Sequence, residues 1–142
     1  MDTSALVGSP PLDPPVRRSP VTLPLLRGLF ATQLATAVLQ PVLAGLFLTG
    51  DVDAITWHGV VGTLLGLLGL LAAVVTLVHV ARGYGRWRVV GVATIAFLLT
   101  GVQIGIGYAG LVQAHVPLGV ALITAIVMLT VWAWSPAARR PR

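Results

Sequence analysis

The sequence predicts an all-α integral membrane protein, a four-helix up-down bundle with its N- and C-termini in the cytoplasm. Of the 142 residues, 56% are hydrophobic and 9% are charged, and the mean hydropathy is +0.93. A soluble domain of this length cannot bury so much apolar surface, whereas a lipid bilayer accommodates it. Four long apolar runs and a one-sided distribution of arginine complete the prediction.

The four apolar runs predict the membrane-spanning helices. Each run is close to the ~20 residues that cross ~30 Å of hydrocarbon at about 1.5 Å per residue. The runs are continuous rather than alternating, which excludes membrane-spanning strands. We place the helices at residues 25–49, 56–81, 89–108 and 112–134, inside a bundle that covers residues 23–135.

The two tails, one loop and the start of the first predicted helix carry all the positive charge. Residues 1–22 are proline-rich and are predicted to form a disordered cytoplasmic tail, and residues 136–142 a basic cytoplasmic tail. The positive-inside rule assigns the arginine-bearing side to the cytoplasm. The nine basic residues all flank this side: Arg17, Arg18, Arg27, Arg82, Arg86, Arg88, Arg139, Arg140 and Arg142.

Charge and composition also restrict location and partners. Because topology accounts for the net charge of +5, nucleic acid is not an expected partner, and the lipid bilayer is. The chain lacks Lys, Glu and Asn, a bias typical of a GC-rich bacterial genome, so a multi-pass protein of a bacterial plasma membrane is expected.

The residue types exclude several kinds of chemistry. There is no cysteine, which rules out disulfides, thiolate metal sites and iron–sulfur clusters. The predicted spans contain no Asp or Glu, so they hold neither a carboxylate proton relay nor a carboxylate pair for hydrolysis. The residue types favour a non-enzymatic role without excluding a reaction, and no catalytic residue is assigned.

Glycines in the spans are spaced for close helix contact. Gly62 with Gly66, and Gly101 with Gly105, form small-xxx-small pairs, and we expect both to pack against neighbouring helices. His79, at the cytoplasmic end of its span, has no partner histidine and is expected to lie at the membrane interface.

The other two histidines belong to an internal repeat of helix pairs. His58 and His115 each lie near the outer end of a span and are followed four residues later by Gly62 and Gly119. The preceding spans match as well, because Gln40 and Gln103 occupy corresponding positions near their outer ends. We expect the side chains of these two glutamines to bridge neighbouring helices through hydrogen bonds. The alternative is that they contact the edge of a cofactor.

The repeat predicts a cofactor or metal site. Two imidazoles at equal depth on diagonal helices of a bundle can both reach one metal at about 2 Å. The same span fits a porphyrin held edge-on, with its iron ligated on both faces by His58 and His115. A glycine one turn below each ligand leaves room for a flat macrocycle against the backbone at Gly62 and Gly119. The predicted cofactor is one haem b.

The run from Gln103 to Gly119, QIGIGYAGLVQAHVPLG, resembles the third and fourth helices of one half of a haem A synthase. Those enzymes duplicate a four-helix unit in which histidines at the outer ends of the second and fourth helices ligate haem. The resemblance implies the same role for His58 and His115. Residues 24–135 also resemble a family of small actinobacterial four-helix membrane proteins.

Several functions remain open at this point. A cytochrome b-like protein would act in electron transfer, haem handling or redox sensing, with a membrane redox partner or as a homodimer. A cofactor-free structural or accessory subunit of a larger membrane complex is the main alternative. A copper or zinc site that adds Asp51 or Asp53 to the histidines, and transport of a small solute, are the remaining hypotheses.

Overall fold

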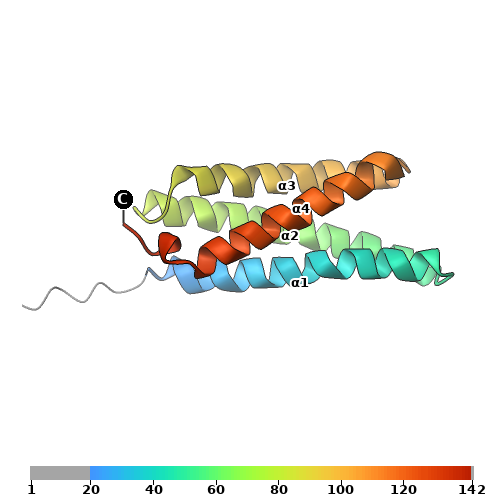
Figure 1. The fold of residues 1–142 in the computed structure, drawn as a ribbon, viewed down its shortest axis with the longest axis horizontal. Coiled ribbons are helices and arrows are strands. Elements are labelled where there is room, and N and C mark those ends of the chain that lie inside the picture. The colour runs from blue at the N-terminus through green and yellow to red at the C-terminus, as the bar shows by residue number, and fades with distance from the viewer. Residues whose placement is uncertain (1–19, 142) are drawn as a thin grey trace, which may run out of the picture.

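Four antiparallel helices form the bundle that the sequence predicts, in a computed structural model that describes residues 20–141 (Figure 1). The all-α prediction is thus confirmed. Of the predicted disordered tail, residues 1–22, the first 19 lie outside the described residues, and Thr22 already begins the first helix. A short 3₁₀ helix, η2, follows the fourth helix. The elements are α1 (Thr22–Leu48), α2 (Asp53–Ala81), α3 (Trp87–Tyr108), α4 (Val112–Trp134) and η2 (Pro136–Ala138).

Each of the four helices is long and apolar enough to cross a membrane, which makes this a polytopic membrane protein. The first three helices begin two or three residues before the predicted apolar runs, because helical backbone continues past the last apolar residue toward water. In the bundle α1 and α3 each pack against both α2 and α4. The helices α2 and α4 therefore lie on a diagonal and run in the same direction.

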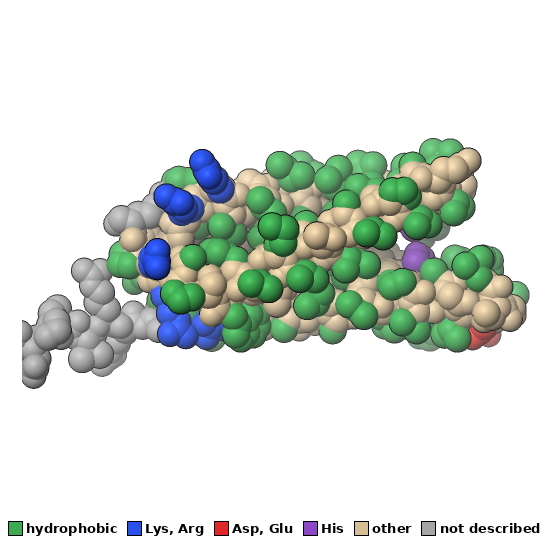
Figure 2. Space-filling view, in the orientation of Figure 1, with side chains coloured by type: hydrophobic (Ala, Val, Ile, Leu, Met, Phe, Trp, Pro, Cys, Tyr) green, Lys and Arg blue, Asp and Glu red, His purple; other side chains and the backbone are tan. Residues whose placement is uncertain are grey.

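The charged residues mark the two ends of the bundle. All six described arginines lie at the end where α1 starts and α4 finishes, which we call the basic end. Asp51 and Asp53 lie at the opposite end, in the α1–α2 loop and at the start of α2 (Figure 2). We call this the histidine end, because His58 and His115 lie there. The one-sided distribution of positive charge that assigns the basic end to the cytoplasm is therefore present in the fold.

The interior is built from small and medium side chains. Phe30 is the largest fully buried side chain, and alanines fill the places where helices approach one another. Large exposed apolar side chains cover the outside of all four helices, as expected for surface that lipid solvates. The buried hydroxyls of Thr76 and Thr100 donate to the carbonyl oxygens four residues earlier, at 2.6 and 2.8 Å, so they need no partner on another helix.

His79 lies near the end of α2, at the basic end, as the sequence predicts. Its side chain is not open to water but fully buried in the protein. Its Nε2 donates to the carbonyl oxygen of Ala138 at 2.9 Å, and its Nδ1 accepts from the hydroxyl of Thr22 at 2.7 Å. The rings of Tyr84 and Trp132 pack against it, with centroids 5.5 and 6.0 Å away. His79 thus joins the start of α1, the end of α2 and the segment after α4.

The C-terminal segment is also more ordered than a tail. Ala138 in η2 is fully buried, and the carbonyl oxygen of Arg140 accepts a hydrogen bond from the backbone N–H of Gly85 at 3.0 Å. Gly85 has φ +68°, which favours glycine, and a Cβ there would lie 3.0 Å from the Trp132 ring. The residues that we assigned to a basic tail therefore close the basic end of the bundle.

One of the two predicted glycine pairs packs inside the bundle and the other does not. A Cβ on Gly62 would lie 3.2 Å from the Gln40 side chain, and one on Gly66 would lie 3.7 Å from Ile104, so this pair lies at helix contacts. A Cβ on Gly101 or Gly105 would meet no atom within 4 Å. The prediction for that second pair is wrong for contacts within this chain.

This difference gives a matched test of the packing. Gly69 is buried in α2, where a Cβ would lie 3.2 Å from Gln33 Nε2 and 3.7 Å from Phe97 Cα. We expect Gly69→Leu to destabilise the fold by about 1–3 kcal/mol, because the helices must separate. Gly101→Leu should change stability by less than about 0.5 kcal/mol. Equilibrium unfolding in mixed micelles measures both, and equal effects would contradict the described packing.

Candidate functional site

The bundle brings His58 and His115 together at the histidine end. His58 lies near the start of α2 and His115 near the start of α4, so the two side chains come from diagonal helices that run in parallel. Their ring centroids are 6.0 Å apart and the ring planes are inclined by 48°. Both side chains are partly buried. They therefore face each other across the bundle and not the lipid.

The main-chain carbonyl of a glutamine on the preceding helix contacts each imidazole ring. His58 Nδ1 lies 3.1 Å from the carbonyl oxygen of Gln40, and His115 Nδ1 lies 3.1 Å from the carbonyl oxygen of Gln103. The two helix pairs thus repeat the same contact at the same distance. In both pairs the main chain of one helix orients the imidazole of the next.

The glutamine side chains occupy the space that the glycines leave. A Cβ on Gly62 would lie 3.2 Å from a terminal amide atom of Gln40, and one on Gly119 would lie 2.9 Å from the amide nitrogen of Gln103. In each pair the amide of the glutamine lies at the position where the sequence predicts a flat macrocycle against the glycine, and that cofactor contact stays a prediction.

The glutamine amides also bond to the histidine main chain. Gln103 Nε2 donates to the carbonyl oxygen of His115 at 2.8 Å. With the amide of Gln40 turned so that its nitrogen faces His58, this nitrogen donates to the carbonyl oxygen of His58 at 3.3 Å, and the amide oxygen accepts from Gly62 N at 2.7 Å. The bridging role that we predicted as the default for both glutamines is therefore what the geometry supports.

These contacts determine which ring nitrogen of His115 carries the proton. The contacts of His58 are compatible with a proton on either ring nitrogen. A carbonyl oxygen only accepts hydrogen bonds, so His115 donates from Nδ1 and keeps a lone pair on Nε2. Nδ1 of His58 has two neighbours from Gln40: the carbonyl oxygen, and the turned amide nitrogen at 2.8 Å. The first favours a proton on Nδ1 and the second a proton on Nε2.

Two buried amide oxygens lack a hydrogen-bond partner among residues 20–141. One is Oε1 of Gln103, beside the histidine pair, and the other is Oε1 of Gln33 in the middle of α1. Gln33 precedes Gln40 by seven residues and faces Gly69, which follows Gly62 by seven. The Gln–Gly contact is thus repeated two turns deeper in the bundle. The second Gln–Gly contact was not predicted, although the seven-residue spacing of both glutamines and both glycines is present in the sequence.

Gly107 is a further residue of the site. A Cβ at this position would lie 2.9 Å from Cε1 and 3.0 Å from Nδ1 of His115. A Cβ this close would require the ring or the backbone to shift. In the first helix pair the corresponding position, four residues after Gln40, is Ala44. The two halves of the repeat are therefore similar but not equivalent.

We expect Gly107→Ala to displace the His115 ring and destabilise the protein by about 1–2 kcal/mol. Gly105→Ala is the matched control on the same helix, since its Cβ enters open space. Equilibrium unfolding in mixed micelles, without added cofactor, compares the two. If both variants behave like the parent protein, the ring does not occupy the described position.

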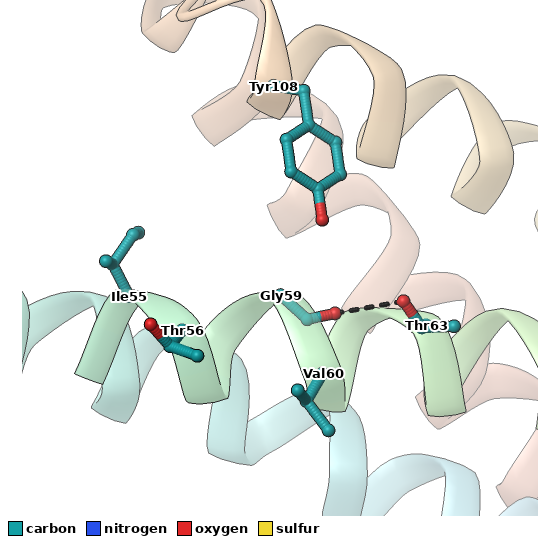
Figure 3. A pocket seen from close by; sticks show the side chains of 6 residues that line it. All are labelled: Ile55, Thr56, Gly59, Val60, Thr63 and Tyr108. Carbon is teal, nitrogen blue, oxygen red and sulfur yellow. Dashed lines mark hydrogen bonds between the residues drawn. The ribbon is translucent and has the colours of Figure 1, made fainter. Parts of the chain in front are cut away.

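The surface at the histidine end has an opening between helices. A space-filling view shows a histidine at the base of a gap between the α1–α2 hairpin and the α3–α4 hairpin (Figure 2). A separate groove of about 390 Å³ lies between α2 and the end of α3 (Figure 3). Its wall includes Tyr108 and Thr63, whose hydroxyl donates to the Gly59 carbonyl at 3.1 Å. Its other side chains are apolar or hydroxyl-bearing, so it supplies no metal ligand set.

The two imidazoles form a small donor set. Within residues 20–141 no three His, Cys, Asp or Glu side chains lie close enough together to hold a metal ion. Asp51 instead accepts a hydrogen bond at 3.1 Å from the backbone N–H of Asp53. A closed zinc site needs four ligands, so the histidine pair alone does not make one.

Comparison of the chain with family models, curated proteins and solved structures finds no match.

Proposed function

We propose that this membrane protein binds one b-type haem between its two helix pairs, with His58 and His115 as axial ligands. The observation that supports this most directly is the 6.0 Å between the ring centroids. An iron–imidazole bond of about 2 Å, plus roughly 1.1 Å from nitrogen to ring centre, predicts about 6 Å between two rings on opposite sides of one iron.

The number of donors also favours haem over a bare metal ion. A porphyrin supplies four nitrogens to its iron, so two imidazoles complete the coordination. The same two side chains would leave zinc or copper with half of its ligands missing. No carboxylate within residues 20–141 joins the pair.

The residues behind the histidines suit axial ligation. Ligating histidines commonly donate their second ring nitrogen to a carbonyl oxygen, which fixes ring orientation and increases basicity. The Gln40 and Gln103 carbonyls are placed for this at Nδ1 of each ring. Ligation through Nε2 would select the Nδ1-protonated form of His58. Haem bound in this way exchanges single electrons.

The position of the site restricts the biological role. Both histidines lie at the end opposite the arginines, so a haem here would sit near the outer face of what we propose is a bacterial plasma membrane. One haem near one face does not carry electrons across the bilayer by itself. We therefore propose a role in electron transfer, haem handling or redox sensing with a membrane redox partner, in keeping with the resemblance to half of a haem A synthase.

Absorption spectroscopy tests the proposal. We expect the detergent-purified protein, expressed with supplied haem, to contain about one haem per chain. It should develop sharp α and β bands when dithionite reduces it. A protein that remains colourless after haem supply would refute the proposal.

A second candidate is a cofactor-free accessory subunit of a membrane complex, or a homodimer. The observation that favours it is the Gly101–Gly105 pair, which faces away from the bundle and meets nothing within 4 Å. Small residues on a lipid-facing surface allow a second helix to approach closely. In Gly101→Leu we expect a co-purifying partner, or the dimer, to be lost while the haem content stays unchanged. That result would separate this role from haem binding.

A further inference from the structure

Arg27 is held in a fixed position at the basic end of the bundle. This residue lies in the second turn of α1, where it is partly buried. Its Nε donates to the carbonyl oxygen of Ala133 at 3.1 Å, and its guanidinium carbon lies 5.5 Å from the ring centroid of Trp134. The contacts clamp the guanidinium at the seam between α1 and α4. The other described arginines are exposed and make no side-chain hydrogen bond to another described residue: Arg82, Arg86, Arg88, Arg139 and Arg140.

The fixed guanidinium keeps most of its hydrogen-bonding capacity. Arginine has five N–H donors, and the Ala133 carbonyl uses the one on Nε. The four N–H groups on the terminal nitrogens have no described acceptor. The carboxylates within residues 20–141, Asp51 and Asp53, lie at the far end of the bundle. Among residues 20–141 the Arg27 guanidinium is therefore a fixed positive charge without a carboxylate partner, and its planar fork suits a bidentate oxyanion.

The surroundings of the guanidinium are apolar and exposed. Trp134, Val131 and Val127 are three and four residues apart on α4, so they lie along one face of the helix. Their exposed fractions are 50%, 64% and 40%. An exposed apolar stripe that leads from a guanidinium toward the middle of the bilayer matches a phosphate group with an acyl chain attached. A free phosphate ion would use only the charged end of this surface.

We propose that Arg27 and Trp134 form a binding site for one anionic phospholipid. The terminal nitrogens of Arg27 donate to the headgroup phosphate. Trp134 lies at the headgroup level, and an acyl chain runs along Val131 and Val127. The positive charge of the Arg27 guanidinium, at the end of the bundle where the other described arginines also lie (Figure 2), selects an anionic lipid over a zwitterionic one. This site is independent of the histidine pair and of haem.

Native mass spectrometry of the full chain, with phosphatidylglycerol or phosphatidylcholine added to the micelles, tests this site. We expect one phosphatidylglycerol to bind at least about tenfold more tightly than phosphatidylcholine. Arg27→Gln should remove this preference. Arg88→Gln deletes the same charge from an exposed position and should reduce binding less than about twofold. Equal losses in the two variants would show general attraction to the basic end and overturn the site.

A second variant and a competition experiment complete the test. If Arg27→Gln fails to fold, Arg27→Lys keeps the charge but loses the planar fork, and we expect it to bind phosphatidylglycerol about threefold to tenfold more weakly than the parent. Unchanged binding by Arg27→Lys would overturn the bidentate site. Inorganic phosphate at millimolar concentration should not displace the lipid. Displacement by phosphate would identify a free-anion site and overturn the assignment to lipid.

Discussion

Replacing either His58 or His115 by alanine is expected to abolish low-spin haem. Both rings approach the same point from diagonal helices, with centroids 6.0 Å apart, so neither has a substitute at its position. The haem content should fall from about one per chain to below about one-tenth, or the remaining haem should have a single axial ligand. The pyridine haemochrome assay measures the content, and the reduced α band reports whether both ligands remain.

The third histidine provides the matched control for this experiment. His79 lies 21 residues after His58 on the same helix, about 31 Å along its axis. His79→Gln retains one donor and one acceptor in the buried position, and we expect its haem content to equal that of the parent. A low-spin spectrum that survives in both His58→Ala and His115→Ala, or that is lost only with His79, would contradict the proposed ligands.

Replacing His79 by alanine is expected to reduce the stability of the protein by about 2–4 kcal/mol. The substitution leaves a cavity between the Tyr84 and Trp132 rings. It also deprives the Thr22 hydroxyl and the Ala138 carbonyl of their partner. Because His79 joins α1, α2 and the C-terminal segment, its loss should loosen the whole basic end.

Equilibrium unfolding in mixed micelles measures this effect, and Thr22→Val provides a graded comparison. That variant removes one of the two hydrogen bonds and keeps the ring, so we expect a loss of about 1 kcal/mol. Protease sensitivity of the segment after α4 should increase in His79→Ala. If His79→Ala is as stable as the parent protein, then the His79 side chain is not buried in the described position.

Hydropathy and charge were sufficient to predict the helices and their arrangement. A run of about 20 apolar residues has to be helical in lipid, because every backbone polar group needs an internal partner there. Four such runs joined by short loops form antiparallel neighbours. His58 and His115 then share one end of the bundle, since both lie at the start of helices that run in the same direction. The diagonal position of α2 and α4 follows from the same connectivity.

The direction in which side chains point around each helix was less predictable. A soluble helix marks its buried face by its apolar residues, but these helices are apolar on all sides because lipid solvates them. The Gly62–Gly66 and Gly101–Gly105 pairs therefore look alike in sequence, although only the first packs inside the chain. The amides that fill the space at Gly62 and Gly119 depend on helix rotation in the same way.

The sequence by itself determined four membrane-spanning helices, the basic end and the level of all three histidines, because hydrophobic length and charge act one segment at a time. Only the tertiary structure decided which groups meet across the bundle. It buried His79 under the segment after α4, turned His58 toward His115, and fixed Arg27 against Ala133 and Trp134. These contacts depend on helix rotation and chain closure, which the pattern of a single apolar helix does not encode.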